Sequence, residues 1–293
     1  YFGDWKWREA LAESMVPIIG KLYRSGVHLL MYGRPLSNSS PIEIMKLHRF
    51  VREAEGNELS ELETYPVIEQ IAKMKLMPCE IDIGEMVSHL LENPQLKPEH
   101  YVNKTLEGQT RTKRSYPLRP KDVVLYGFGR IGRLITRILV TDTGAGANWR
   151  LRAVVIRDSG HEDDLIKRAS LLRNDSVHGT FPGTIRVNKK NNSLIVNGNE
   201  IFVIYANDPR KVKYKDYGIK KATIIDNTGA WKDEEGLGQH TRNPSVDKVI
   251  LTAPAKGKIK NIVFGINDEK LKQDEKIVAA ASCTTNAIAP PLN

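Results

Sequence analysis

The feature that most constrains this chain is a glycine-rich turn, GFGRIG, at Gly127–Gly132. A short apolar segment, Val123–Tyr126, precedes the turn, and apolar residues at helical spacing follow it. Three glycines between a strand and a helix permit a tight turn, a close backbone approach to a pyrophosphate, and close packing of the helix on the strand. The free N–H groups at the start of that helix favour an anion. We therefore predict a dinucleotide-binding fold.

The chain beyond residue 120 alternates short β-rich segments with helical ones. This alternation is typical of βαβ units and a mostly parallel sheet, so the predicted class is α/β of the Rossmann type. The segment 184–205 has asparagine-rich turns and instead predicts antiparallel hairpins. The expected parallel strands are Val123–Tyr126, Leu151–Ile156, Ala222–Asp226, Lys248–Thr252, Ile262–Gly265 and Ile277–Ala281.

Residues 1–105 carry helical patterns, and we expect an all-α amino-terminal extension. Ser40-Pro41-Ile42-Glu43 has the capping serine, early proline and third-position glutamate of a helix start. A further helix is expected over about 59–76, with Pro66 as a kink or break. Residues 106–120 are polar, basic and proline-flanked, and are interpreted as a linker.

Composition excludes several classes of protein. The apolar runs are too short to span a bilayer, and no secretory signal is visible, so we expect neither a membrane partner nor export. The two cysteines, Cys79 and Cys283, have no metal-ligand spacing, and we expect no metal site. The net charge is +9, but the basic residues are scattered. We interpret them as solvated surface that can attract phosphorylated ligands, and we do not expect a nucleic-acid partner.

An acidic residue, Asp158, follows the second predicted strand and lies 26 positions beyond Gly132. In dinucleotide-binding folds an acidic residue at about 20 positions binds the ribose hydroxyls. The alternative is a carboxylate that caps the helix near His161. We favour ribose binding.

A cysteine, Cys283, stands between the last predicted strand and an apparent helix start. The start of a helix is a common position for a cysteine nucleophile. The alternative, a buried structural cysteine, is equally compatible with the local pattern alone.

Four segments, in their order and approximate spacing, resemble those of the phosphorylating glyceraldehyde-3-phosphate dehydrogenases. They are GFGRIGR at 127–133, DSVHG at 175–179, NTG at 227–229 and SCTTN at 282–286. The resemblance covers about 122–293 and does not extend to 1–120. It implies a nucleotide-binding domain over 121–282 and the beginning of a truncated catalytic domain at 283–293.

The resemblance also implies roles for individual residues. Cys283 would be the nucleophile, and Ser282 and Thr284 would hold the substrate or inorganic phosphate. The thiolate would form a hemithioacetal with the aldehyde, hydride transfer would leave a thioester, and phosphate would release an acyl phosphate. The residues implied at the cofactor are Gly127, Gly129, Arg130, Ile131, Gly132, Asp158, Thr228, Gly229 and Thr252.

Two departures from the family pattern affect these expectations. The family's catalytic histidine lies beyond Asn293, so we expect residues 1–293 alone to be inactive. Arg157 replaces a common asparagine, as in forms that accept NADP, because arginine can meet a 2′-phosphate. Asp158 would repel that phosphate. We expect NAD as the cofactor, with NADP tolerated.

Three functions remain open. The first is oxidation of glyceraldehyde 3-phosphate in glycolysis or gluconeogenesis, with phosphate as the second substrate. The second is the same chemistry on erythrose 4-phosphate. The third is a non-catalytic regulatory module that binds nucleotides or nucleic acid. For an enzyme of this family the resemblance implies a cytoplasmic homotetramer.

Overall fold

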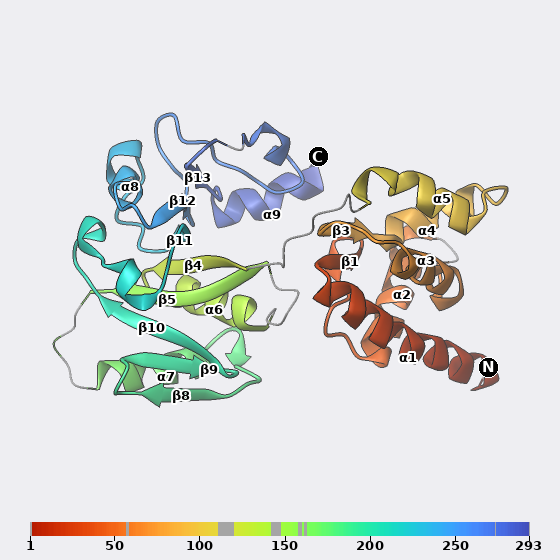
Figure 1. Ribbon diagram of the computed structural model, residues 1–293, viewed down its shortest axis with the longest axis horizontal. Helices are drawn as coiled ribbons and strands as arrows, with labels where there is room; N and C mark the ends of the chain where they lie inside the picture. The colour runs from red at the N-terminus through yellow and green to blue at the C-terminus, as the bar shows by residue number, and fades with distance from the viewer. Residues whose placement is uncertain are drawn as a thin grey trace. The chain divides into compact units, whose positions relative to one another are not determined.

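The computed structural model describes residues 2–56, 59–110, 120–141, 148–157, 160, 163–272 and 274–292. The chain forms two compact units, one within 1–119 and the other made of 120–143 and 149–293 (Figure 1). Most of the predicted linker, residues 111–119, lies outside the described residues. No helix in the described part of the chain combines the length and apolar character needed to cross a membrane.

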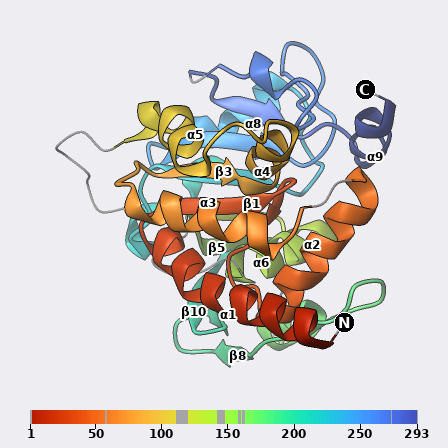
Figure 2. The ribbon, with the colours of Figure 1, turned by 90° about the vertical axis from the view of Figure 1, so that its right-hand side faces the viewer.

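The amino-terminal unit contains the expected helices, and α1 packs against both α2 and α3 (Figure 2). Ser40 and Ser60 each form a capping box at a helix start, with Glu43 and Glu63 respectively. The predicted helix around 59–76 passes through Pro66 without a break. The helices are α1 (Phe2–Arg24), α2 (Pro41–Glu55), α3 (Glu61–Lys73), α4 (Ile83–Glu92), α5 (Pro98–Thr105) and the 3₁₀ turn η1 (Glu107–Gln109).

This unit also contains a three-stranded sheet, which the expectation of an all-α extension did not include. Strand β1 (Val27–Met31) lies between β2 (Arg34–Pro35) and β3 (Cys79–Asp82). Four of the five β1 residues are buried. Because buried residues occur at consecutive positions of this short strand, it has no two-residue alternation, and its pattern cannot be distinguished from that of a buried helix.

The second unit is built on an eight-stranded sheet with the order β13-β12-β11-β4-β5-β10-β9-β8. The six strands from β13 to β10 are parallel. Their order is the 3-2-1-4-5-6 arrangement of the Rossmann fold, so the predicted class is confirmed. The six strands are β4 (Lys121–Tyr126), β5 (Trp149–Ile156), β10 (Asn199–Tyr205), β11 (Ala222–Asp226), β12 (Val246–Leu251) and β13 (Ile277–Ala279).

The two faces of this sheet bury separate cores. In β4, Val123 and Leu125 face one core with residues of α6 (Arg130–Thr141) and α7 (Asp164–Arg173), and Val124 and Tyr126 face the other. The second core includes residues of α8 (Glu234–Thr241) and η3 (Tyr214–Tyr217). Burial on both faces explains why these strands are continuously apolar in sequence.

The hairpins expected within 184–205 are present. Strand β8 (Ile185–Asn188) pairs antiparallel with β9 (Ser193–Val196), which pairs antiparallel with β10. Their turns place Asn192, Asn197 and Gly198 at positive φ, which asparagine and glycine tolerate.

The prediction of a strand at Ile262–Gly265 is wrong. Only the preceding residue, Asn261, makes an isolated bridge, to Ala279, and Gly265 turns at positive φ. The remaining elements are β6 (Asn174–Asp175), β7 (Gly179–Thr180), η2 (Pro209–Lys211), η4 (Asp268–Lys270) and α9 (Cys283–Leu292).

Candidate functional site

The carboxyl ends of β4 and β11 mark the point where the strand order of the parallel sheet reverses. The chain proceeds from β4 to β5 on one side and later returns to β11 on the other. Ligands of open α/β folds bind in the crevice at such a point. A cavity of about 380 Å³ lies here, lined by Tyr126, Gly127, Phe128, Gly129, Val155, Ile156, Arg157, Arg168, Ala206, Asn207, Thr228, Ala230 and Trp231.

The three glycines of the turn occupy different environments. Gly127 has φ +97°, and a Cβ there would lie 3.0 Å from Thr228 Cγ2. A Cβ on Gly132 would lie 2.6 Å from the Gly127 carbonyl oxygen, so only glycine permits this contact of helix and strand. A Cβ on Gly129 would meet no atom within 4 Å, which leaves space for a ligand against the backbone. This turn fits a pyrophosphate.

The first turn of α6 begins directly after the lining residue Gly129, but Arg130, Ile131 and Gly132 do not themselves line the cavity. The helix begins at Arg130, directly after Gly129, and its free N–H groups attract an anion. Ile131 and Gly132 follow in this turn, and half of the Ile131 side chain remains exposed.

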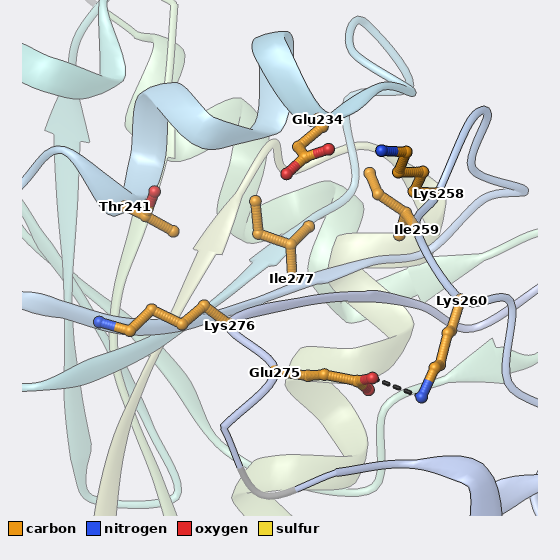
Figure 3. A pocket seen from close by; sticks show the side chains of 8 residues that line it. All are labelled: Glu234, Thr241, Lys258, Ile259, Lys260, Glu275, Lys276 and Ile277. Carbon is orange, nitrogen blue, oxygen red and sulfur yellow. Dashed lines mark ion pairs between the residues drawn. The ribbon is translucent and has the colours of Figure 1, made fainter.

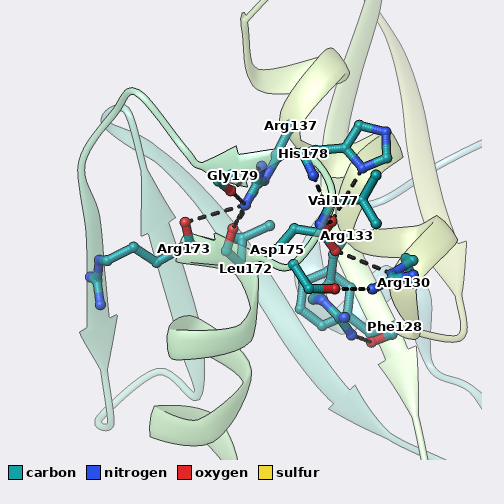
Figure 4. Close-up of polar contacts among 11 residues, drawn as sticks. Phe128, Arg130, Arg133, Arg137, Leu172, Arg173, Asp175, Val177, His178 and Gly179 are labelled. Atoms are coloured by element: carbon teal, nitrogen blue, oxygen red, sulfur yellow. Dashed lines mark hydrogen bonds and ion pairs between the residues drawn. The ribbon is translucent and has the colours of Figure 1, made fainter.

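The Arg130 side chain is held by the DSVHG segment, as Figure 4 shows. Its Nε lies 3.3 Å from Asp175 Oδ2, and a terminal nitrogen donates to Ser176 Oγ. Asp175 Oδ1 accepts the backbone N–H groups of Val177 and His178, each at 3.0 Å. These two hydrogen bonds hold the pKa of the Asp175 carboxyl far below its usual range, and the bond from the His178 N–H has the larger effect. Asp175 therefore presents a permanent charge that orients Arg130.

A second arginine fixes the position of that segment. Arg137 of α6 donates to the carbonyl oxygens of Leu172, Arg173 and Gly179 (Figure 4). These bonds connect both ends of the loop that carries Asp175 to the helix of the glycine turn. His178, which contacts Asp175 at 3.2 Å, belongs to this structural network.

The opposite wall of the cavity is formed by the segment after β11. Thr228 lines it, and Gly229 follows at φ +66°. The Asn227 amide donates to the Ile225 carbonyl oxygen at 3.1 Å. Thr252, at the end of β12, donates its hydroxyl to the Asp226 carbonyl oxygen at 3.1 Å. Asp226 at the end of β11 is therefore hydrogen-bonded to Thr252, a predicted cofactor residue at the end of the adjacent strand β12.

The end of β5 forms the third side. Arg157 lines the cavity, together with Asn207 from the segment after β10. Asp158, predicted to bind the ribose, lies outside the described residues.

The predicted nucleophile, Cys283, is the first residue of α9 and is exposed. Ser282 Oγ accepts the Thr285 backbone N–H at 3.0 Å and lies 2.9 Å from Thr284 Oγ1, so it caps this helix. Helix α9 follows β13, which is parallel to β4 and β11, so the SCTTN segment lies at the same edge of the sheet as the glycine turn. None of Ser282, Cys283 and Thr284 lines the nucleotide cavity itself.

A second cavity of about 390 Å³ lies between α8 and β13 (Figure 3). Three of its eight lining residues are lysines, but Lys260 is paired with Glu275, and Glu234 adds a further negative charge. It contains none of the predicted site residues and lacks a glycine turn. The switch-point cavity is therefore the better dinucleotide site.

Sequence reasoning missed two residues behind this site, Asp226 and His240, which form a buried pair. It also missed Trp231, a lining residue. Asp226 could have been noticed in the sequence, because it is an acidic residue at the end of a largely apolar predicted strand. The position of His240 on α8 carries no such signal, because its partner is distant in sequence.

Comparison with known proteins identifies the kind of domain in which this cavity lies. Residues 121–234 match the family model described as the NAD binding domain of glyceraldehyde 3-phosphate dehydrogenase. The matched range includes the glycine turn, the DSVHG loop and the wall formed by Thr228.

Curated relatives agree with this match. A glyceraldehyde-3-phosphate dehydrogenase-like protein of Pseudomonas aeruginosa is 51% identical over 282 residues, or 95% of this chain and 61% of that protein. Its match therefore extends into the amino-terminal unit. The glyceraldehyde-3-phosphate dehydrogenases of Thermotoga maritima and Zymomonas mobilis are 42% and 37% identical, over 57% and 58% of this chain. The chain spans 47% and 48% of their lengths.

Proposed function

Because the chain belongs to the glyceraldehyde-3-phosphate dehydrogenase family, we propose that the protein is an NAD-dependent oxidoreductase that converts glyceraldehyde 3-phosphate and phosphate to an acyl phosphate. The observation that carries this proposal is the shared sheet edge: the glycine turn after β4 and the Cys283 segment after β13 both follow carboxyl ends of parallel strands.

The cofactor is proposed to bind across the switch point. The backbone at Gly127, Gly129 and the start of α6 would hold the pyrophosphate, with Arg130 beside it. Thr228, Gly229 and Thr252 would border the other half of the dinucleotide, and Asp158 would bind the adenosine ribose. Arg157 lines the cavity, so a 2′-phosphate would meet a cation, and we propose that NADP is tolerated.

The chemistry is proposed to proceed through the Cys283 sulfur. Its thiolate adds to the aldehyde carbon and gives a hemithioacetal, with Ser282 and Thr284 beside the substrate or phosphate. The bound nicotinamide supplies the acceptor for the two electrons of the oxidation. The C–H bond of that carbon breaks and its hydrogen leaves with these two electrons as a hydride, a proton leaves the hemithioacetal oxygen, and the carbon remains on Cys283 as a thioester. Phosphate oxygen then attacks that carbon, the C–S bond breaks, and the thiolate is regenerated.

Two other functions remain as alternatives. The same residues would oxidise erythrose 4-phosphate if its longer chain were accepted. A non-catalytic, nucleotide-binding role would use the cavity without Cys283. For the family function we propose a homotetramer in the cytoplasm, as the resemblance implies.

The test is dehydrogenase activity of the complete gene product with NAD or NADP, in the presence and absence of phosphate. We expect phosphate-dependent reduction with glyceraldehyde 3-phosphate, faster than with erythrose 4-phosphate. Cys283→Ser should lower turnover by orders of magnitude and leave dinucleotide affinity unchanged. Faster turnover of erythrose 4-phosphate would favour the second substrate. Tight dinucleotide binding without turnover of either aldehyde would favour the non-catalytic role.

A further inference from the structure

A histidine and a carboxylate are completely buried behind the predicted cofactor cavity. Asp226 ends β11, His240 lies on α8, and both side chains are 0% exposed. His240 Nε2 lies 3.0 Å from Asp226 Oδ2. Burial of a charged or polar group is costly unless its partners compensate for lost hydration. The pair is not among the groups that the proposed chemistry uses.

The other atoms of Asp226 hold the cavity wall. Its Oδ1 accepts the Thr228 backbone N–H at 2.8 Å and the Thr228 hydroxyl at 2.7 Å. Its backbone carbonyl accepts the N–H of Thr252 at 3.0 Å and the hydroxyl of the same residue at 3.1 Å. One residue therefore fixes both threonines that are predicted to border the cofactor.

His240 in turn fixes Asp226, and two aromatic rings that line the cavity enclose it. The Tyr126 and Trp231 rings lie 4.6 and 5.6 Å from the imidazole, both edge-on. The other ring nitrogen, Nδ1, has no hydrogen-bond partner among the described residues, so the imidazole is held by Asp226 through Nε2 alone. Because an acceptor receives this bond, Nε2 carries the proton. Removal of the bond would free the carboxylate to rotate away from Thr228.

We propose that Asp226 and His240 are positioning residues for the dinucleotide, and that their hydrogen bond holds the Thr228 wall in its binding-competent conformation before the ligand arrives. This inference rests on the proposed cofactor site. Apparent affinity falls in proportion to the fraction of protein in the competent conformation. A hydrogen bond from an imidazole to a buried carboxylate is strong enough for its loss to change that fraction about tenfold.

Two substitutions of His240 separate positioning from simple burial. The amide nitrogen of His240→Gln can occupy the place of Nε2 and donate to Asp226. The shorter His240→Asn places its amide where Nδ1 lies and cannot reach the carboxylate. Both replace the ring with a buried amide, and they differ by one methylene, whose packing loss is measured by the thermal unfolding of each variant.

The experiment is titration of the full chain with NADH, followed by ligand fluorescence, with thermal unfolding recorded for each variant. We expect His240→Gln to bind within about twofold of the unchanged protein and His240→Asn to bind about tenfold more weakly. His48→Gln alters another buried histidine, in the amino-terminal unit, and should leave the affinity unchanged.

The outcomes are distinguishable. If the unchanged protein does not bind NADH, the proposed cofactor site is wrong. If it binds NADH and the two His240 variants bind equally well, the positioning role is wrong. Should His240→Asn not fold, Thr228→Val removes one of the two bonds to Asp226 Oδ1 and should weaken NADH binding several-fold; unchanged binding would overturn the inference.

Discussion

The two units each contain a cavity of similar size, and only one is suited to a dinucleotide. The cavity in the amino-terminal unit is about 440 Å³ and that at the switch point about 380 Å³. The first is lined by side chains of α5, η1 and adjacent segments: Met74, His100, Asn103, Lys104, Glu107 and Thr110. The second is bounded by a glycine turn, a helix start and a threonine held by a buried carboxylate. Converging backbone groups, rather than volume, identify the site.

The buried histidines show the same difference. His48 in the amino-terminal unit contacts the Ile44 carbonyl oxygen at 2.8 Å and Thr64 Oγ1 at 2.9 Å. The contact with Thr64 joins α2 to α3, and His48 Nδ1 also lies 3.6 Å from Oε1 of the buried Glu61. His240 instead holds a carboxylate whose remaining bonds end at the cavity wall. A buried histidine beside a carboxylate therefore indicates a nearby binding site only when that carboxylate also orients groups that line a cavity.

The largest difference in NADH affinity is expected between glycine-to-alanine variants of the two units. In Gly132→Ala the new Cβ would meet the Gly127 carbonyl oxygen at 2.6 Å, so the turn must shift and NADH affinity should fall about 30-fold or more. Gly129→Ala meets no protein atom within 4 Å and should weaken binding without lowering the melting temperature. Gly108→Ala, also in open space, should change neither quantity. Calorimetry and NADH titration would test all three; equal affinities would contradict the cavity assignment.

A smaller effect is expected at the loop that orients Arg130. Asp175→Asn removes the charge beside the guanidinium, whereas an amide oxygen in the place of Oδ1 can still accept both backbone N–H groups. NADH affinity should fall about tenfold, and the effect should shrink at high salt because Arg130 is half exposed. Glu53→Gln breaks an exposed ion pair with Arg49 in the other unit and serves as the matched control. Equal losses in both variants would rule out a specific role for Asp175.

Some of these features could be predicted from the sequence and others could not, because some depend on neighbouring residues and others on residues brought together by packing. The glycine turn, the helix start at Ser40 and the hairpin turns each depend on residues close in sequence, and all are present. Strand β1 was missed because its apolar run lacks alternation. The Asp226–His240 pair was missed because only packing of α8 on the sheet brings those residues together.

Loss of a helix cap should affect stability alone. Ser40→Ala removes the side chain that accepts the Glu43 backbone N–H and should lower the free energy of unfolding of the amino-terminal unit by about 1 kcal/mol. Because Ser40 belongs to the other unit, NADH affinity should not change. Chemical denaturation with parallel NADH titration measures both quantities, and a change in affinity would show that the units are coupled.

The smallest effect is a pH dependence confined to the amino-terminal unit. Burial lowers the pKa of His48 below its usual value near 6.5. The unfolded chain therefore binds a proton that the folded unit resists, so stability is retained above that usual value and decreases as the pH falls below it. His48→Gln should flatten the melting temperature between pH 7 and pH 5. An identical pH profile in the variant would exclude His48 as the cause.

The most direct test of the division between the units is hydrogen–deuterium exchange of the complete gene product with and without saturating NADH. Exchange should slow in Gly127–Gly132 and in Asn227–Ala230, where backbone N–H groups and the wall held by Asp226 meet the ligand. The segments Val27–Met31 and Cys79–Asp82 should exchange at the same rate in both samples. Protection confined to the amino-terminal segments, or none at saturation, would contradict the account.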